Sequence, residues 1–338
     1  MFAVRIDRYG PPQSLYLGDV PTPAPGPQDV LVRVRAVGVN RLDLLLREGE
    51  VFRIPLPRIA GTDLAGEIVA VGEQVPSERI GERVFAAPIL SCGHCAHCLR
   101  GDDNLCAQFG TLGSTIDGGY AEYVRLPARN AIPLPASMDW VRAASFGLTY
   151  ATAAAMLRRG RLQAGESVLV FGANGGLGHA AVELAHEAGA RVIAVSRKRA
   201  LHAALIERGA HAVVEPGPDM PDAVREATGG RGADLAFEHV GAATFEHAVA
   251  ALAMDGRLVL GGVTTGSEAT LDLKAVFTKR LEVLGCRGSG RRDLDAVLAL
   301  AELGRVNPHV AHVLPLAQAA HAQALLEHGL LGKIVLTV

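Results

Sequence analysis

Four of the five cysteines lie in one short segment, SCGHCAHCLRGDDNLC, at residues 91–106. With the spacing C-x2-C-x2-C-x7-C, they are Cys92, Cys95, Cys98 and Cys106. Four thiolates on a short loop can surround one tetrahedral Zn2+, and a metal with four protein ligands has no open position for a substrate. The pattern therefore predicts a structural zinc site. Its alternatives are disulfide bonds among these cysteines, or His94 or His97 as a ligand.

A second chemical signal is the glycine-rich stretch GANGGLG at residues 172–178, which joins a short apolar run to an amphipathic stretch. Read as Ala173-x-Gly175-x-x-Gly178, it is a dinucleotide-binding fingerprint with alanine in first position. Free N–H groups at the start of the following helix would attract a pyrophosphate. The expected cofactor-binding residues are Gly172, Asn174, Gly175, Gly176, Leu177 and Gly178. The alternative is a tight strand-to-helix turn that binds nothing.

The choice of nucleotide depends on the residues after Val195. An NAD enzyme usually has a carboxylate there for the ribose 2′-hydroxyl, whereas this chain has Ser196, Arg197, Lys198 and Arg199. A hydroxyl and cations suit a 2′-phosphate, which a carboxylate would repel. The sequence favours NADP(H) over NAD, with Ser196, Arg197 and Lys198 as ligands. The alternative is an ordinary solvated helix start.

The elements that must position these residues differ along the chain. After residue 143, short apolar runs alternate with amphipathic stretches, which is typical of βα units. Expected strands are 167–171, 191–195, 212–214, 233–237, 257–260 and 281–284, and six such runs predict a doubly wound parallel sheet. The first 140 residues are Pro-rich and Val-rich, with strands expected at 30–39, 64–71 and 84–89. The tail predicts a helix at 294–303, an extended piece at 306–314, a helix at 316–328 and a strand at 333–338.

Composition limits the partners. A length of 338 residues indicates about two domains. The chain has 33 Lys+Arg and 35 Asp+Glu, a net charge of −2, so it has no basic field for nucleic acid. It has no apolar stretch of about 18 residues and no signal-peptide pattern, so we expect no membrane contact. Without these segments the expected location is the cytoplasm, and in such a reducing compartment clustered cysteines normally serve metal or redox chemistry.

Several segments occur in a familiar order: GVNRLDLLLREG (38–49), GTDLAGEIVAVG (61–72), the cysteine segment, GGYAEYV (118–124), LTYATA (148–153), the glycine loop and GKIVL near the C-terminus. The chain thereby resembles the medium-chain dehydrogenase/reductase superfamily over essentially its whole length. The resemblance implies an α/β protein with a GroES-like β-rich catalytic domain at 1–142 and 288–338, its zinc loop at 91–107. A Rossmann NADP-binding domain would occupy 143–287. It also implies a homodimer formed through sheet edges around 281–284.

The chain departs from the zinc alcohol dehydrogenases of that family. They carry Cys where this chain has Asn40 and His where it has Thr62, and their third ligand would fall near Ala144 or Ser145. These side chains do not replace a Cys/His set, so the family's catalytic zinc is expected to be absent. Without such a Lewis acid, oxidation of an unactivated alcohol loses its means of stabilising an alkoxide. A different metal held by Asp43 and Asp63 stays open.

The pattern GVN-x-x-D resembles the metal-free quinone oxidoreductase and enoyl reductase branches, which use NADPH to reduce a quinone or an electron-poor C=C bond. Such a substrate needs a hydrogen bond to the oxygen where charge develops, and Asn40 and Thr62 are the candidate donors. The resemblance further implies that Asp43 orients neighbouring backbone, Thr149 faces the nicotinamide and Lys333 reaches the pyrophosphate. The alternative for Asn40 and Asp43 is a turn-capping pair.

We therefore expect an NADPH-dependent oxidoreductase that acts on a small electrophilic molecule and holds one structural zinc. Alternatives are an alcohol or aldehyde dehydrogenase of the zinc-type family and a non-catalytic NADPH-binding protein. Glu238 and His239 end the fourth expected strand and are candidates for cofactor contact. Water or Tyr150 would supply the proton that follows the hydride.

Overall fold

The computed structural model describes residues 1–338 and divides the chain into two compact units. The first unit comprises Met1–Thr149 and Gly290–Val338, and the second comprises Tyr150–Ser289. Helix α4 (Gly147–Arg159) contains the boundary between them. The division differs by seven residues from the predicted boundary at 142/143 and by two residues from that at 287/288. No helix is both long enough and apolar enough to cross a membrane.

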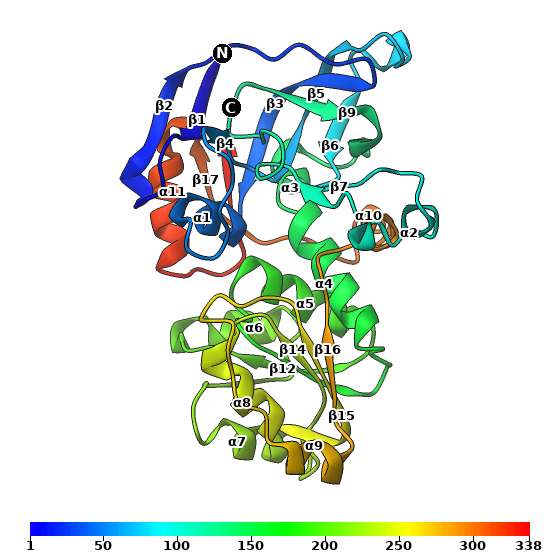
Figure 1. The fold of residues 1–338 in the computed structure, drawn as a ribbon. Coiled ribbons are helices and arrows are strands. Elements are labelled where there is room, and N and C mark those ends of the chain that lie inside the picture. Colours follow the sequence, from blue (N-terminus) through cyan, green and yellow to red (C-terminus); the bar gives the residue numbers. More distant parts are fainter. The chain divides into compact units, whose positions relative to one another are not determined.

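The first unit is built mainly on antiparallel sheets (Figure 1). Its strands are β1 (Phe2–Ile6), β2 (Leu15–Asp19), β3 (Asp29–Val39), β4 (Arg58–Ile59), β5 (Asp63–Val71), β6 (Arg83–Ala86), β7 (Ile89–Leu90), β8 (Gly110–Thr111), β9 (Tyr123–Pro127), β10 (Ala131–Pro133), β17 (Val310–Pro315) and β18 (Lys333–Thr337). Its helices are α1 (Arg41–Glu48), α2 (Ala96–Leu99), α3 (Trp140–Ala143), α10 (Arg291–Glu302) and α11 (Ala319–Glu327). The main sheet has the order β10-β6-β5-β3-β18-β17, and β9 also pairs with β3.

Strand β3 organises this unit because its apolar residues, including Val34, Val37 and Val39, are buried. It pairs antiparallel with β5 on one side and with β18 on the other. In the β3–β18 pairing Ile334 lies opposite Val39. This register brings Lys333, near the C-terminus, beside Asn40, which directly follows β3.

Two expectations for this unit need correction at their boundaries. The run 84–89 is not one strand, because β6 ends at Ala86 and β7 begins at Ile89. Pro88 lies between them, and proline has no N–H to donate to a sheet ladder. In the tail, the extended piece begins at Val310 rather than at residue 306. The helix expected at 316–328 starts as a 3-10 turn and becomes α-helical at Ala319.

The second unit contains the predicted six-stranded parallel sheet, which is confirmed. Its strands are β11 (Ser167–Val170), β12 (Arg191–Val195), β13 (Ala212–Val214), β14 (Ala233–Glu238), β15 (Leu252–Leu260) and β16 (Glu282–Gly285). Its helices are α5 (Gly176–Glu187), α6 (His202–Glu207), α7 (Met220–Ala227), α8 (Ala242–Ala250) and α9 (Leu273–Lys279). The strand order is β13-β12-β11-β14-β15-β16 (Figure 1). The order reverses between β11 and β14, where ligands bind in such sheets.

Candidate active site, cofactor loop and zinc site

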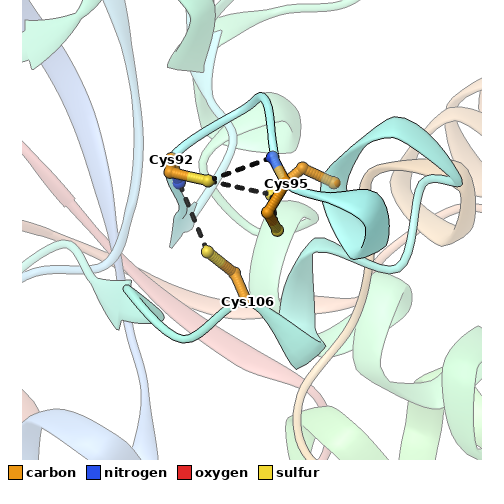
Figure 2. A group of neighbouring side chains, drawn as sticks. Cys92, Cys95 and Cys106 are labelled. Atoms are coloured by element: carbon orange, nitrogen blue, oxygen red, sulfur yellow. Dashed lines mark hydrogen bonds between the residues drawn. The ribbon is translucent and has the colours of Figure 1, made fainter.

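The four clustered cysteines have their sulfur atoms close together, and Figure 2 shows three of them, Cys92, Cys95 and Cys106. Their sulfur atoms all lie within 4.8 Å of one another. Cys98 Sγ is 3.8 Å from Cys92 Sγ and 3.5 Å from Cys95 Sγ. A tetrahedral zinc with zinc–sulfur bonds of about 2.3 Å requires sulfur atoms about 3.8 Å apart, whereas a disulfide bond is only about 2.05 Å long. The cluster therefore fits a structural zinc, and all its cysteines are free thiols in this structure.

Backbone N–H groups point at the sulfur atoms of this cluster (Figure 2). Cys92 N–H donates to Cys106 Sγ and Cys95 N–H donates to Cys92 Sγ, both at 3.4 Å. Gln108 N–H donates to Cys106 Sγ at 3.3 Å. Hydrogen bonds from the backbone N–H groups of His94 and Cys95 lower the pKa of Cys92 to about 6. These hydrogen bonds favour the thiolate form of Cys92, which is the form that binds metal.

The two histidines in the loop bind other groups. His94 Nδ1 lies 2.9 Å from the carbonyl oxygen of Cys92, and His97 Nδ1 lies 3.1 Å from the Arg100 guanidinium. Four sulfur atoms are enough for a tetrahedral zinc, and both imidazoles are hydrogen-bonded to other groups.

In the first unit, Asp43 connects the two segments that carry the candidate hydrogen-bond donors. Its carboxylate accepts from Asn40 N–H at 2.8 Å, from Gly61 N–H at 3.1 Å and from the Tyr120 hydroxyl at 3.2 Å. Asp43 is fully buried, and burial raises its pKa to about 6. Asn40 precedes α1 and Gly61 precedes Thr62, so one carboxylate fixes the backbone at both positions. Tyr120 was not identified from the sequence.

The Asn40 side chain lies in a buried polar cluster with Asp63 and Lys333. Asn40 Nδ2 donates to Asp63 Oδ2 at 3.0 Å. Lys333 Nζ donates to Asn40 Oδ1 at 2.5 Å and to Asp63 Oδ2 at 3.1 Å. Asp63 Oδ1 accepts from Leu148 N–H at 2.6 Å, close to the start of α4. The sequence assigned Lys333 to the pyrophosphate, and the structure places it in this ion pair.

The hydroxyl groups of the two predicted threonines have acceptors within the first unit. Thr62 is fully buried and donates to the carbonyl oxygen of Leu112 at 3.1 Å. Thr149 makes a longer contact of 3.5 Å with the carbonyl oxygen of Ser145. Asn40 and Thr62 are the candidate donors to a substrate oxygen. One amide N–H of Asn40 donates to Asp63, and the amide has a second N–H. Thr62 has a single hydroxyl proton, which it donates to the Leu112 carbonyl oxygen.

In the second unit, the glycine loop has the backbone of a nucleotide-binding turn. Gly172 has φ of +56°, and a Cβ on Gly178 would lie 2.2 Å from the Gly172 carbonyl oxygen. Gly178 must therefore be glycine for β11 and α5 to pack. Gly175 caps α5 from an extended conformation, and a Cβ there would have only one neighbour within 4 Å, at 3.5 Å. Because no side chain caps α5, its first N–H groups can receive an anion.

The residues expected at the ribose phosphate follow β12. Ser196 is buried, its hydroxyl donates to Asn174 Oδ1 at 3.4 Å, and it accepts from Lys198 N–H at 3.2 Å. The structure thus brings Ser196 together with a residue of the glycine loop. Arg199 forms an ion pair with Glu215. The guanidinium of Arg197 is exposed and makes no hydrogen bond or ion pair within the chain.

His239 contacts the glycine loop itself. Its Nε2 donates to the carbonyl oxygen of Phe171 at 2.9 Å, and its ring would lie 3.1 Å from a Cβ on Gly172. Desolvation lowers the pKa of His239 to about 4, so the ring is neutral at physiological pH. Its neighbour Glu238 accepts hydrogen bonds from the backbone N–H groups of Val240 and Gly241, just before α8. The sequence suggested cofactor contact for this pair; His239 contacts the loop that would hold the cofactor, whereas Glu238 binds backbone N–H groups of the segment before α8.

The tyrosine considered as a proton donor is engaged inside the second unit. The Tyr150 hydroxyl donates to Glu183 Oε2 at 2.5 Å. The other oxygen of Glu183 lies 3.3 Å from the Arg208 guanidinium. The phenolic proton of Tyr150 is thus held by a carboxylate of α5.

Known proteins match the chain along its length. The alcohol dehydrogenase GroES-like domain model matches residues 26–136, and the zinc-binding dehydrogenase model matches residues 176–302. A quinone oxidoreductase of Lama guanicoe is 31% identical, over 99% of this chain and 97% of its own. An NAD-dependent alcohol dehydrogenase of Sulfolobus acidocaldarius is 32% identical over 100% of both chains. The chain belongs to the medium-chain dehydrogenase/reductase superfamily. Among solved structures, an NAD-dependent alcohol dehydrogenase has 39% sequence identity to this medium-chain dehydrogenase/reductase. The two chains superpose over 100% of both lengths with a TM-score of 0.94.

Membership in the medium-chain dehydrogenase/reductase superfamily makes the protein an oxidoreductase and confirms the resemblance stated from its motifs. Its relatives include quinone oxidoreductases and NAD-dependent alcohol dehydrogenases. The family therefore gives the reaction class, and the substrate and nucleotide must be argued from the residues of this chain.

Proposed function

We propose that the protein is an NADPH-dependent reductase of a quinone or an activated alkene, such as an enone or enoyl compound, and works without a catalytic zinc. The observation that carries this proposal is the chemistry around Asn40. An amide and the Thr62 hydroxyl stand where zinc alcohol dehydrogenases have metal ligands. The Lys333 ammonium lies 2.5 Å from Asn40 Oδ1.

The residues near Asn40 do not suit a divalent cation. Asp43 accepts three hydrogen bonds. Asp63 accepts three more, one of them from the Lys333 ammonium. A metal at either carboxylate would have to displace these donors, and the buried ammonium would repel it.

When bound, NADPH supplies the hydride for this reaction. The chain then has to stabilise negative charge on the substrate oxygen. Asn40 does so with its second amide N–H, in a buried setting where a hydrogen bond to a developing oxyanion is strong. Thr62 becomes a second donor if its hydroxyl exchanges the Leu112 carbonyl for the substrate. Asp43 holds the backbone of both segments, and we assign Thr149 to the nicotinamide side of the bound cofactor.

We propose NADPH rather than NADH because of the charge after β12. The Ser196 hydroxyl donates to the glycine loop residue Asn174 and accepts from the backbone N–H of Lys198, and Arg197 has no internal partner. A guanidinium without an internal partner is the group that a 2′-phosphate would bind.

The proposal is tested by following NADPH oxidation with a panel of quinones, enones and enoyl thioesters, each compared with NADH. We expect turnover with at least one class and a preference for NADPH. Consumption with none of them would contradict the proposal and favour a non-catalytic NADPH-binding protein.

A second candidate is an alcohol or aldehyde dehydrogenase, because alcohol dehydrogenases are among the similar proteins. The discriminating assay is reduction of NAD+ or NADP+ by a panel of primary and secondary alcohols. Turnover with unactivated alcohols would favour this candidate, since it requires stabilisation of an alkoxide.

We also propose a cytoplasmic homodimer that acts on a small molecule. A reducing compartment keeps the four clustered cysteines as thiols that can bind zinc. The edge strand β16 is the surface on which a dimer would form.

A further inference from the structure

The zinc loop, residues 91–107, makes contacts beyond its own cysteines, at the start of helix α10 (Figure 1). The Asp103 carboxylate is 6% exposed and accepts a hydrogen bond from Arg291 N–H at 2.6 Å. Its neighbour Asp102 forms an ion pair with Arg292. All four residues belong to the first unit. Two consecutive acids of the zinc loop therefore hold the first two residues of α10.

The contact of Asp103 with Arg291 is a helix cap supplied by a distant segment. Arg291 is the first residue of α10, and an N–H at that position has no partner inside the helix. A carboxylate there satisfies the N–H and interacts favourably with the helix dipole. Gly290 lets the segments approach closely, because a Cβ on it would lie 2.2 Å from the Gly101 carbonyl oxygen. Gly290 is also the residue at which the chain re-enters the first unit.

The position of the two acids depends on the cysteine cluster. Asp102 and Asp103 lie between Cys98 and Cys106, two of the candidate zinc ligands. The helical pieces around them are α2, with 4 residues, and a 3-10 turn of 3 residues at Asp103–Leu105. Helices this short are not stable by themselves. Metal binding by the four sulfur atoms would therefore fix the loop that caps α10.

The other end of α10 is held without the zinc loop. The guanidinium of Arg142, on α3, donates to the carbonyl oxygen of Ala301 at 3.2 Å and to that of Val306 at 2.8 Å. Ala301 belongs to the last turn of α10. A change in the zinc loop should therefore affect the first turn of this helix and leave its last turn in place.

Two of the cysteines are also arranged for a different reaction. Cys95 and Cys98 are partly exposed, whereas Cys106 is buried. Their sulfur atoms lie 3.5 Å apart in a C-x2-C segment. A disulfide bond would bring them to about 2.05 Å, which the spacing of about 3.8 Å around a tetrahedral zinc does not permit. This pair can therefore bind the metal or form a disulfide, but not both.

We propose that Cys95 and Cys98 are a peroxide-sensitive thiolate pair, and that their oxidation to a disulfide releases the zinc and uncaps the start of α10. One thiolate attacks hydrogen peroxide, which gives a sulfenic acid and a hydroxide ion. The other thiolate attacks the sulfenic sulfur, forms the disulfide and displaces a second hydroxide ion. The two sulfur atoms thus lose two electrons, which the peroxide takes up.

The oxidised loop keeps only Cys92 and Cys106 as thiolates, and a structural zinc needs four ligands. The metal is therefore released, and the segment that carries Asp102 and Asp103 is no longer fixed at both ends. A thiol reductant cleaves the disulfide by exchange and restores the site. The inference concerns the zinc loop and α10, and it does not depend on the proposed reaction.

The first test uses the zinc-loaded protein and hydrogen peroxide. The chelator 4-(2-pyridylazo)resorcinol should detect release of about one zinc per chain, and peptide mass spectrometry should find Cys95 joined to Cys98. Dithiothreitol with added zinc should reverse both changes. Retention of zinc would overturn the inference, as would its release through sulfinic acids without this disulfide. Cys286→Ser is the matched control and should release the same zinc, and loss of release in that variant would also count against the pair.

Hydrogen exchange tests the connection to α10. After peroxide treatment, amides in the first turn of α10 should exchange about tenfold faster, the size expected when a helix cap is lost. The last turn, held by Arg142, and helix α5 in the other unit should not change. Unchanged exchange in the first turn would contradict the proposed connection. Faster exchange throughout the first unit would do the same, because it indicates general unfolding rather than a local release.

Asp103→Ala separates the cap from the metal. This variant should retain zinc and show the faster exchange before oxidation, and peroxide should then add little, because the two changes act on the same contact. Asp272→Ala, which removes the cap of α9, is the matched control and should leave α10 unchanged. A further tenfold increase on oxidation of Asp103→Ala would overturn the role of Asp103. If Asp103→Ala does not fold, Asp103→Asn, which removes the charge, permits the same comparison.

Discussion

At the scale of single residues, the proposed reduction depends on which side chain donates to the substrate oxygen. Asn40 and Thr62 occupy the positions that distinguish this chain from zinc alcohol dehydrogenases. The two side chains differ in how many hydrogen bonds they can still donate. The Thr62 hydroxyl donates its one proton to the Leu112 carbonyl oxygen, whereas Asn40 has a second amide N–H besides the one that donates to Asp63.

We predict that Asn40→Ala lowers kcat with the electron-poor substrate about 100- to 1,000-fold, the range seen when one oxyanion donor is removed. Thr62→Val, which keeps the side-chain shape, should lower kcat less, by about tenfold or under. Steady-state kinetics at saturating NADPH measure both. Wild-type turnover in Asn40→Ala would exclude Asn40 as the principal donor.

The nucleotide preference also belongs to single residues. Arg197→Ala should raise the dissociation constant for NADPH by about 10- to 100-fold, because a charge-assisted hydrogen bond contributes about 1.5–3 kcal/mol. The NADH constant should change little. Arg191→Ala, at the opposite end of β12, is the matched control and should affect neither nucleotide. Equal weakening of NADPH and NADH by Arg197→Ala would contradict the preference for NADP.

At the scale of elements, the sequence identified most strands and helices but could not pair them. Apolar runs and glycine patterns predicted both β3 and β18. Their mutual register places Lys333 against Asn40 and Asp63, and it depends on contacts between residues about 270–290 positions apart. A single sequence carries no local signal for such a contact, so Lys333 was assigned from the family pattern. The cysteine cluster could be predicted from the sequence, because the four candidate metal ligands lie within fifteen residues of one another.

The contact between His239, which directly follows β14, and the glycine loop gives a prediction at this scale. His239→Phe keeps a ring of similar size against Gly172 but leaves the Phe171 carbonyl without its donor. The free energy of unfolding should fall by about 1–3 kcal/mol, and the dissociation constants for NADPH and NADH should rise by a similar factor. Titration of both nucleotides and thermal unfolding measure these effects.

His211→Phe is the control for that experiment, because His211 precedes β13 and accepts from Val192 N–H away from the glycine loop. It should reduce stability and leave nucleotide binding unchanged. Loss of NADPH binding alone in His239→Phe would show a direct phosphate contact rather than a role through the loop.

At the scale of the whole molecule, the parallel sheet ends in the edge strands β13 and β16, and β16 has exposed apolar neighbours. Strand β16 is the last in the order of strands. Large apolar side chains are exposed on it and on α9, with Val283 at 42%, Leu273 at 73% and Phe277 at 72%. An unpaired strand edge with exposed apolar residues favours association with a second copy.

We predict that the protein is a dimer in solution and that Leu273→Asp/Phe277→Asp makes it monomeric. Sedimentation velocity gives the molecular mass of each form. Leu303→Asp is the matched control, since Leu303 is equally exposed, at 74%, but lies after α10 in the other unit. A dimer that survives the double substitution would place the interface elsewhere.

Reduction without a catalytic zinc is tested most directly by the metal content of the active enzyme, measured by mass spectrometry together with NADPH-dependent turnover. We predict about one zinc per chain, because a single four-cysteine site binds one ion, and we predict its loss in Cys95→Ser. The fraction of Cys95→Ser protein that stays folded should still turn over the electron-poor substrate. A second metal ion per chain, whose removal abolishes turnover and whose return restores it, would contradict the account.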